Sequence, residues 1–169
     1  MNDAHLHLIV NHFPIIGTVF GLGILISGMI LKNNSVKTVA YVLFIVAAIF
    51  AAFSMGTGEG AEELVEDMPN VGKQIIHDHE ELAEGFAILL YVIGFMSLIS
   101  IYLSIKKNAL GKYSAIITLV LVSIAVFLAK EVGTSGGEIR HTEIRPKAIL
   151  GAEAEQKTGS KEKSDADND

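Results

Sequence analysis

The sequence predicts an all-α integral membrane protein built as a bundle of four transmembrane helices. Half of its 169 residues are hydrophobic, and they are concentrated in four blocks, whereas a soluble domain mixes apolar and polar residues more evenly. Each block is long enough to cross a hydrocarbon core as a helix and carries no charge in its middle. The predicted spans are residues 13–31, 38–55, 86–105 and 113–129, within one domain over residues 1–150.

The two ends of the chain carry different signals. No basic region precedes the first apolar block and no small-residue cleavage site follows it, so we expect this block to remain in the mature protein. Residues 151–169 have almost no apolar content and are expected to form a disordered polar tail.

The charged residues between the blocks predict an orientation. The two short connections contain no acid, and the middle connection at 57–84 is strongly acidic. By the positive-inside rule the lysine-containing turns lie in the cytoplasm. We therefore expect a multi-pass protein of the bacterial inner membrane with periplasmic N- and C-termini. The lysines of the short connections are Lys32, Lys37, Lys106, Lys107 and Lys112.

Small residues occur four apart on the first two spans. Gly17 and Gly21 have this spacing in the first span, and alanines have it in the second, at 47 and 51 and at 48 and 52. Such faces allow helices to approach closely, so we expect them to serve packing.

The chain has the pattern of two tandem helical hairpins. The first begins with His5-Leu-His7 and the second with His77-Asp-His79. Each continues with a span, a short lysine-containing turn and a second span, and ends in a glycine-rich element, at 56–60 and at 133–138. Both copies have the same orientation, so a pseudo-two-fold axis would run along the membrane normal. In such repeats the functional site tends to lie between the copies.

Composition and motifs exclude several classes of function. The chain has no cysteine, which excludes disulfides, iron–sulfur clusters, thiolate zinc sites and covalent c-type haem. A net charge of -6 argues against a nucleic-acid partner. No nucleophile–base pair, phosphate-binding loop or H-E-x-x-H zinc motif is present. Nothing in the sequence favours a hydrolase or a transferase.

All six histidines fall on the periplasmic side of the predicted topology. A low-spin b-type haem is held by two neutral imidazoles, usually from different helices, within an apolar bundle. His12, at the edge of an apolar helix, is the best-placed single candidate ligand, and His7 and His79 are matched members of the two repeats. His141 completes the candidate haem-binding set. The alternative is that these histidines are ordinary interfacial polar residues in a structural subunit of a larger membrane complex.

A single transition-metal ion is another interpretation of the same region. His77, His79 and Glu84 offer imidazole and carboxylate ligands. Because two histidines spaced by two do not share a helical face, such a site requires an extended or turn segment. Glu84 has two further interpretations: it accepts a hydrogen bond from a ligand imidazole, or it is a first-turn acid favoured by the helix dipole.

Several of these segments resemble a widespread family of prokaryotic four-helix membrane proteins of unknown function. The resemblance lies in His7-Leu-Ile-Val-Asn-His12-Phe13-Pro14, in the glycines at 56–60, in His79 before an alanine-containing helix start, and in the glycines at 133–137. The family hallmark is H-P-x-x-V-H-F-P, and the resemblance covers roughly residues 5–145. Leu8 stands where the family usually has proline, and His141 follows the last glycines sooner than the family's later histidine does.

The resemblance implies a four-helix fold, a haem b cofactor and a role in respiratory electron transfer. By position, His7, His12 and His79 match the family's histidines. The expected partners are membrane lipid, quinone, and a periplasmic redox protein or a larger respiratory complex. This role is that of an electron carrier or redox subunit rather than a stand-alone catalyst.

Overall fold

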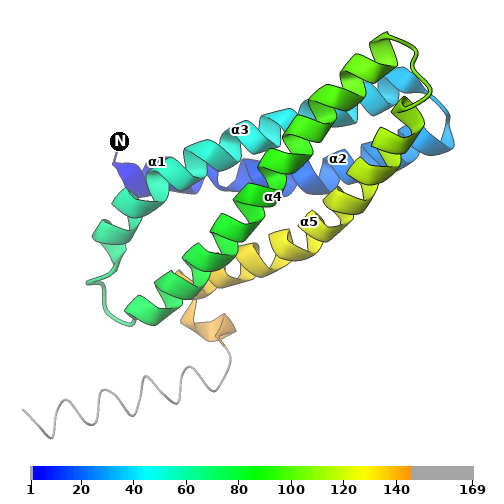
Figure 1. The fold of residues 1–169 in the computed structure, drawn as a ribbon. Helices are drawn as coiled ribbons and strands as arrows, with labels where there is room; N and C mark the ends of the chain where they lie inside the picture. The colour runs from blue at the N-terminus through cyan, green and yellow to red at the C-terminus, as the bar shows by residue number, and fades with distance from the viewer. Residues whose placement is uncertain (1, 146–169) are drawn as a thin grey trace, which may run out of the picture.

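The computed structural model describes residues 2–145, which form helices joined by short turns (Figure 1). It confirms the predicted all-α four-helix bundle. The predicted tail at 151–169 and the last residues of the predicted domain lie outside the described residues. The elements are α1 (Asp3–Val10), α2 (His12–Ile30), α3 (Asn34–Val65), α4 (Lys73–Ile105), α5 (Gly111–Arg140) and the short 3₁₀ helix η1 (Thr142–Ile144).

The first two helices act as one membrane-length rod. Asn11, the residue between them, keeps helical backbone angles (φ -67°, ψ -21°). Pro14 has no N–H to donate to the carbonyl of Val10, which interrupts the regular hydrogen bonding at this point. Counted as one segment, α1 and α2 cover 28 residues, and α3, α4 and α5 cover 32, 33 and 30. All four segments are long and apolar enough to cross a membrane.

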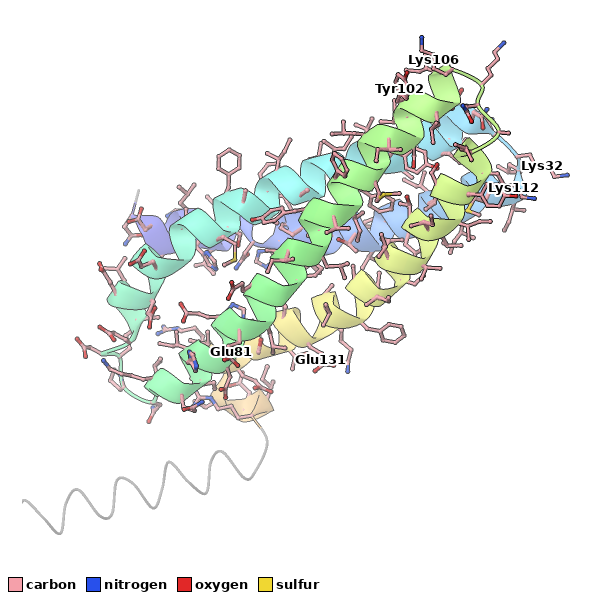
Figure 2. The ribbon with its side chains drawn as sticks, in the orientation of Figure 1. Lys32, Glu81, Tyr102, Lys106, Lys112 and Glu131 are labelled. Atoms are coloured by element: carbon pink, nitrogen blue, oxygen red, sulfur yellow. The ribbon has the colours of Figure 1, made fainter. Side chains whose placement is uncertain are left out.

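The four long helices form a closed ring. α2 packs against α3, α3 against α4, α4 against α5, and α5 returns to α2. In this order α2 and α4 are diagonal partners across the bundle, as are α3 and α5. Figure 2 shows Lys32, Lys106 and Lys112 at one end of the ring and Glu81 and Glu131 towards the other. We call these the lysine end and the acidic end.

The helices extend further at the acidic end than the sequence predicted. The long connection expected at 57–84 is mostly helix, since only residues 66–72 separate α3 from α4. α5 likewise continues past the predicted limit of 129 to Arg140. At 1.5 Å per residue the helices reach about 42–50 Å, whereas a hydrocarbon core is about 30 Å thick. Several turns therefore project beyond the apolar layer at this end.

Small residues let the helices approach closely, as the sequence predicted for Gly17 and the alanines of the second span. A Cβ atom added at Gly17 would lie 3.1 Å from the Cβ of Ala47, and one at Gly94 would lie 2.9 Å from the Cβ of Ala48. The fully buried Phe44 fills the space beside Gly21. Close backbone approach supplies the dispersion contacts that associate helices in lipid, where no hydrophobic drive acts between them.

The two turns at the lysine end have the same geometry. Lys32 and Lys107 adopt left-handed backbone angles (φ 49° and 50°). The following residues, Asn33 and Asn108, each donate their N–H to the carbonyl five residues earlier, at 2.9 and 3.0 Å. Each asparagine side chain then accepts the N–H two residues later, at 2.9 Å in both turns. This is a Schellman ending followed by an asparagine cap, so the two hairpins match in structure at their turns.

Candidate functional site

His7 lies on α1 at the acidic end, half-buried against α3. Its Nδ1 is 3.1 Å from the carbonyl oxygen of Ser54 and 3.2 Å from the hydroxyl oxygen of Thr57. A carbonyl oxygen can only accept, so Nδ1 carries the proton and donates it. The other ring nitrogen, Nε2, is left with an available lone pair.

His79 lies on α4 in a matching environment provided by α5. Its Nδ1 is 2.9 Å from the hydroxyl oxygen of Ser135. That hydroxyl donates its own hydrogen to the carbonyl of Val132, at 3.1 Å. The oxygen of Ser135 therefore accepts from Nδ1–H of His79, which gives His79 the same tautomer as His7 and leaves its Nε2 free.

His7 and His79 occupy equivalent positions in the two hairpins. Each lies on the first rod of its hairpin and is oriented by residues at the end of the second helix of the same hairpin. His7 and His79 are close enough to interact electrostatically. Since α1 continues α2, and α2 is diagonal to α4, the pair joins the two hairpins across the bundle. Two half-buried imidazoles with free Nε2 atoms, one from each hairpin, therefore lie at the acidic end of the bundle.

Glycines leave room beside both rings. A Cβ atom added at Gly136 would lie only 3.0 Å from Cε1 of His79, and one at Gly58 would lie 3.9 Å from Cε1 of His7. One turn after His7, the buried side-chain oxygen of Asn11 has no hydrogen-bond partner in the described part of the chain. Buried acceptors are normally hydrogen-bonded, so this unpaired oxygen is available to accept a hydrogen bond from a bound group.

The remaining candidate haem ligands lie elsewhere. His12 is exposed, and its Nδ1 contacts the carbonyl of Leu8 one turn earlier, at 2.9 Å. His141 is exposed at the end of α5, with its Nδ1 2.9 Å from the carboxylate of Glu143. The backbone N–H of Glu143, together with His141, holds the pKa of that carboxyl below its usual value. Neither His12 nor His141 is half-buried and bonded to another long helix, as His7 and His79 are.

The metal-ligand set expected at His77, His79 and Glu84 is not assembled. Within residues 2–145, no three histidine, cysteine or acidic side chains gather in a way that could hold a metal ion. The segment is part of α4 and not the extended stretch that such a site requires. His77 is exposed, with Nε2 3.6 Å from Glu81, and Glu84 is also exposed. Residues two apart on a helix point to different sides, which separates His77 from His79.

Sequence reasoning missed the residues that orient the two rings, namely Ser54, Thr57 and Ser135. A signal for two of them was present. Thr57 and Ser135 are hydroxyl residues within the two glycine-rich elements that end the hairpins. When the two halves of the sequence are aligned, each half shows a histidine in its H-x-H pair and a hydroxyl residue in its glycine-rich element.

No family model matches the chain, and neither does any curated protein or solved structure.

Proposed function

We propose that this protein holds haem b between His7 and His79 and transfers electrons within the membrane. The observation that carries this proposal is the pair of half-buried imidazoles from different hairpins, both with Nδ1–H donated to the protein and Nε2 free. Two neutral imidazoles are a common ligand pair for low-spin haem b, and His7 and His79 would supply that pair. Hydrogen bonds to the far ring nitrogen fix the tautomer and the orientation of a metal-binding histidine.

The surroundings fit such a group. Val10 and Val132 are buried one turn inward from His7 and Ser135, so the inner side of the site is apolar. Gly58 and Gly136 place no side chain against the rings. When bound, haem supplies a reversible one-electron iron couple. The protein holds the imidazoles in one orientation and keeps water from the inner side, and both effects tune the potential.

The positive-inside rule supports a periplasmic position for the site. With the lysine end in the cytoplasm, the histidine pair lies near the periplasmic face of the bacterial inner membrane. Electrons would pass between the quinone pool and a periplasmic redox protein or a larger respiratory complex. We propose a role as an electron carrier or redox subunit rather than a stand-alone catalyst.

The test is a spectrum of the full-length protein, expressed with ample haem and purified in detergent. We expect a Soret band in the oxidised sample and a sharp α-band after reduction with dithionite. The variants His7→Ala and His79→Ala should each lose the six-coordinate low-spin spectrum. His5→Ala and His77→Ala are matched controls, because they remove the exposed members of the same two H-x-H pairs, and they should keep it.

Three outcomes would contradict the proposal. Absence of a Soret band in the parent protein excludes haem binding. If the same preparation contains stoichiometric metal without porphyrin, the protein binds a metal ion instead. Loss of the spectrum in the His5 or His77 control excludes a specific role for the pair. If His12→Ala loses the low-spin spectrum and His79→Ala keeps it, the haem ligands are a different set of residues. If neither haem nor metal is bound, a structural subunit is the remaining interpretation.

A further inference from the structure

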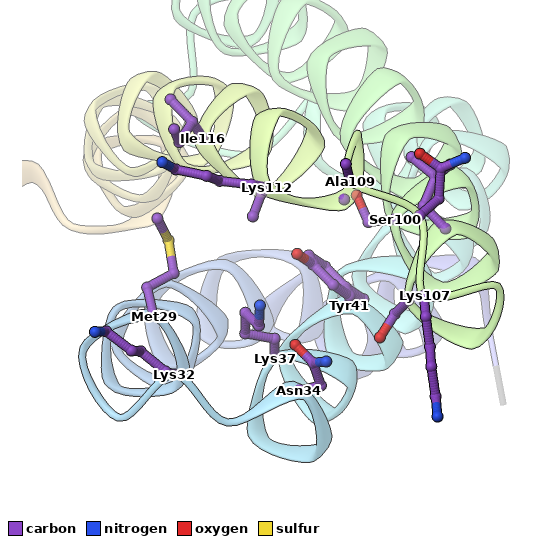
Figure 3. A pocket seen from close by; sticks show the side chains of 15 residues that line it. Met29, Lys32, Asn34, Lys37, Tyr41, Ser100, Lys107, Ala109, Lys112 and Ile116 are labelled. Carbon is purple, nitrogen blue, oxygen red and sulfur yellow. The ribbon is translucent and has the colours of Figure 1, made fainter.

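A cavity of about 800 Å³ lies at the lysine end of the bundle, far from the histidine pair (Figure 3). All four long helices and both short turns contribute to its wall. Four lysines are among its lining residues, two from each turn region, and none of the lining residues is acidic. The four are Lys32, Lys37, Lys107 and Lys112.

Within residues 2–145, the positive charge of this cavity has no counterion among its lining residues. Residues 4–58 and 85–130 contain no aspartate or glutamate at all. The ion pairs of lysines in the described chain, Lys73 with Glu66 and Lys130 with Glu131, involve other lysines. α3 and α5 begin here and α2 and α4 end here, so the helix dipoles largely cancel and the lysines carry the positive potential. Charges near a low-dielectric wall are weakly screened, which makes an external anion the natural neutralising group.

Lys37 and Tyr41 from one hairpin and Lys112 from the other lie around the hollow. In Figure 3, Lys37 and Lys112 extend over it from opposite sides, and the hydroxyl of Tyr41 points into it. Tyr41 is only 2% exposed, so its hydroxyl is a fixed polar group at the base. The arrangement follows from the repeated K-N-x-x-x-K sequence at 32–37 and 107–112, which places equivalent lysines on the two sides.

We propose that this cavity binds a phosphate group, supplied by the head of an anionic phospholipid or by free phosphate. The lysine ammonium groups provide the charge. The apolar side chains of Met29, Leu103 and Ile116 also line the wall, which suits a phosphodiester attached to lipid chains. Basic pockets between transmembrane helices on the cytoplasmic side are known to hold anionic lipid heads. The site is independent of haem, because it lies at the opposite end of the bundle.

The test is native mass spectrometry of the full-length protein in detergent, titrated with phosphatidylglycerol, phosphatidylcholine or inorganic phosphate. We expect phosphatidylglycerol to bind at one site per chain and phosphatidylcholine to bind far more weakly. Lys37→Gln and Lys112→Gln should each weaken binding about fivefold, from the usual contribution of one lysine near an anionic head. Lys106→Gln is the matched control, because Lys106 lies over the ring of Tyr102 and does not line the cavity.

The outcomes separate the two sources of phosphate and the ways in which the proposal fails. Tight binding of inorganic phosphate, with the same dependence on Lys37 and Lys112, supports the site and assigns it to free phosphate. Binding of neither phosphatidylglycerol nor phosphate overturns it, as does an equal loss in the Lys106 control. Circular dichroism in phosphatidylcholine confirms that each variant is folded, and the two single variants report on the site independently.

Discussion

Replacement of Gly136 by alanine tests the position of the His79 ring directly. In the structure an added Cβ would lie 3.0 Å from Cε1 of His79, closer than ordinary contact. The ring must then shift by a few tenths of an ångström and strain the bond to Ser135, which is 2.9 Å long. Gly58→Ala is the matched control, because its Cβ would lie at an ordinary 3.9 Å from Cε1 of His7.

The magnitudes follow from two opposing effects. Alanine stabilises a helix by about 1 kcal/mol relative to glycine, and both glycines lie within helices. Loss of a half-buried hydrogen bond costs about 1 kcal/mol. Gly58→Ala should therefore raise the free energy of unfolding by about 1 kcal/mol, and Gly136→Ala should leave it nearly unchanged. A mispositioned ligand imidazole should also weaken haem retention by about tenfold or more in Gly136→Ala.

The assay is unfolding of each variant by a denaturing detergent, followed by circular dichroism, with the reduced haem spectrum recorded alongside. Equal stabilisation by both substitutions, together with an unchanged spectrum in Gly136→Ala, would refute the reasoning. That result would mean that the His79 ring does not lie against Gly136.

Three further predictions concern packing, backbone conformation and pH. Phe44→Ala should cost about 3–5 kcal/mol of unfolding free energy through cavity formation. Phe127→Ala, at a side chain 74% exposed, should change it by less than about 0.5 kcal/mol, and equal losses would contradict the packing. Lys32→Gly and Lys107→Gly should each stabilise the protein by about 0.5–1 kcal/mol, because φ is near 50° in both turns; destabilisation in the same assay would contradict this. Because the pKa of Glu143 is lowered, its carboxylate stabilises η1 when the pH is above the usual glutamate pKa, and this stabilisation is lost as the pH falls. Amide hydrogen exchange of the backbone of η1 should show this pH dependence, and Glu143→Gln should remove it.

The sequence was sufficient to predict the four spans, the two turns and the small-residue contacts. Apolar blocks of membrane length have few alternative structures, because lipid leaves backbone groups no partner outside a helix. The extension of α3 to Val65 and the start of α4 at Lys73 were not predicted. Outside the apolar layer, hydropathy no longer predicts whether a segment is helical. The only remaining signal for a helix is the weaker intrinsic propensity of glutamate, alanine and leucine.

Prediction of the site was limited by side-chain direction. Matching the two halves singled out His7 and His79, but their hydroxyl partners depend on how far each helix is rotated about its axis. His12 follows His7 by five residues, which is about 140° around a helix, and it is exposed in the structure. Glu84 follows His79 by the same interval and is exposed in the same way.

The shortness of the connection at 66–72 has a consequence for assembly. These seven residues are the single covalent link between two hairpins, each of which carries its own lysine turn, its own cap and its own histidine. Each hairpin therefore contains the information for its own insertion and orientation. Two separately translated halves, divided at Asp67, should insert independently and associate into the same bundle. A pair of identical hairpins would satisfy the same arrangement, because the second helix of each hairpin packs against the first helix of the other.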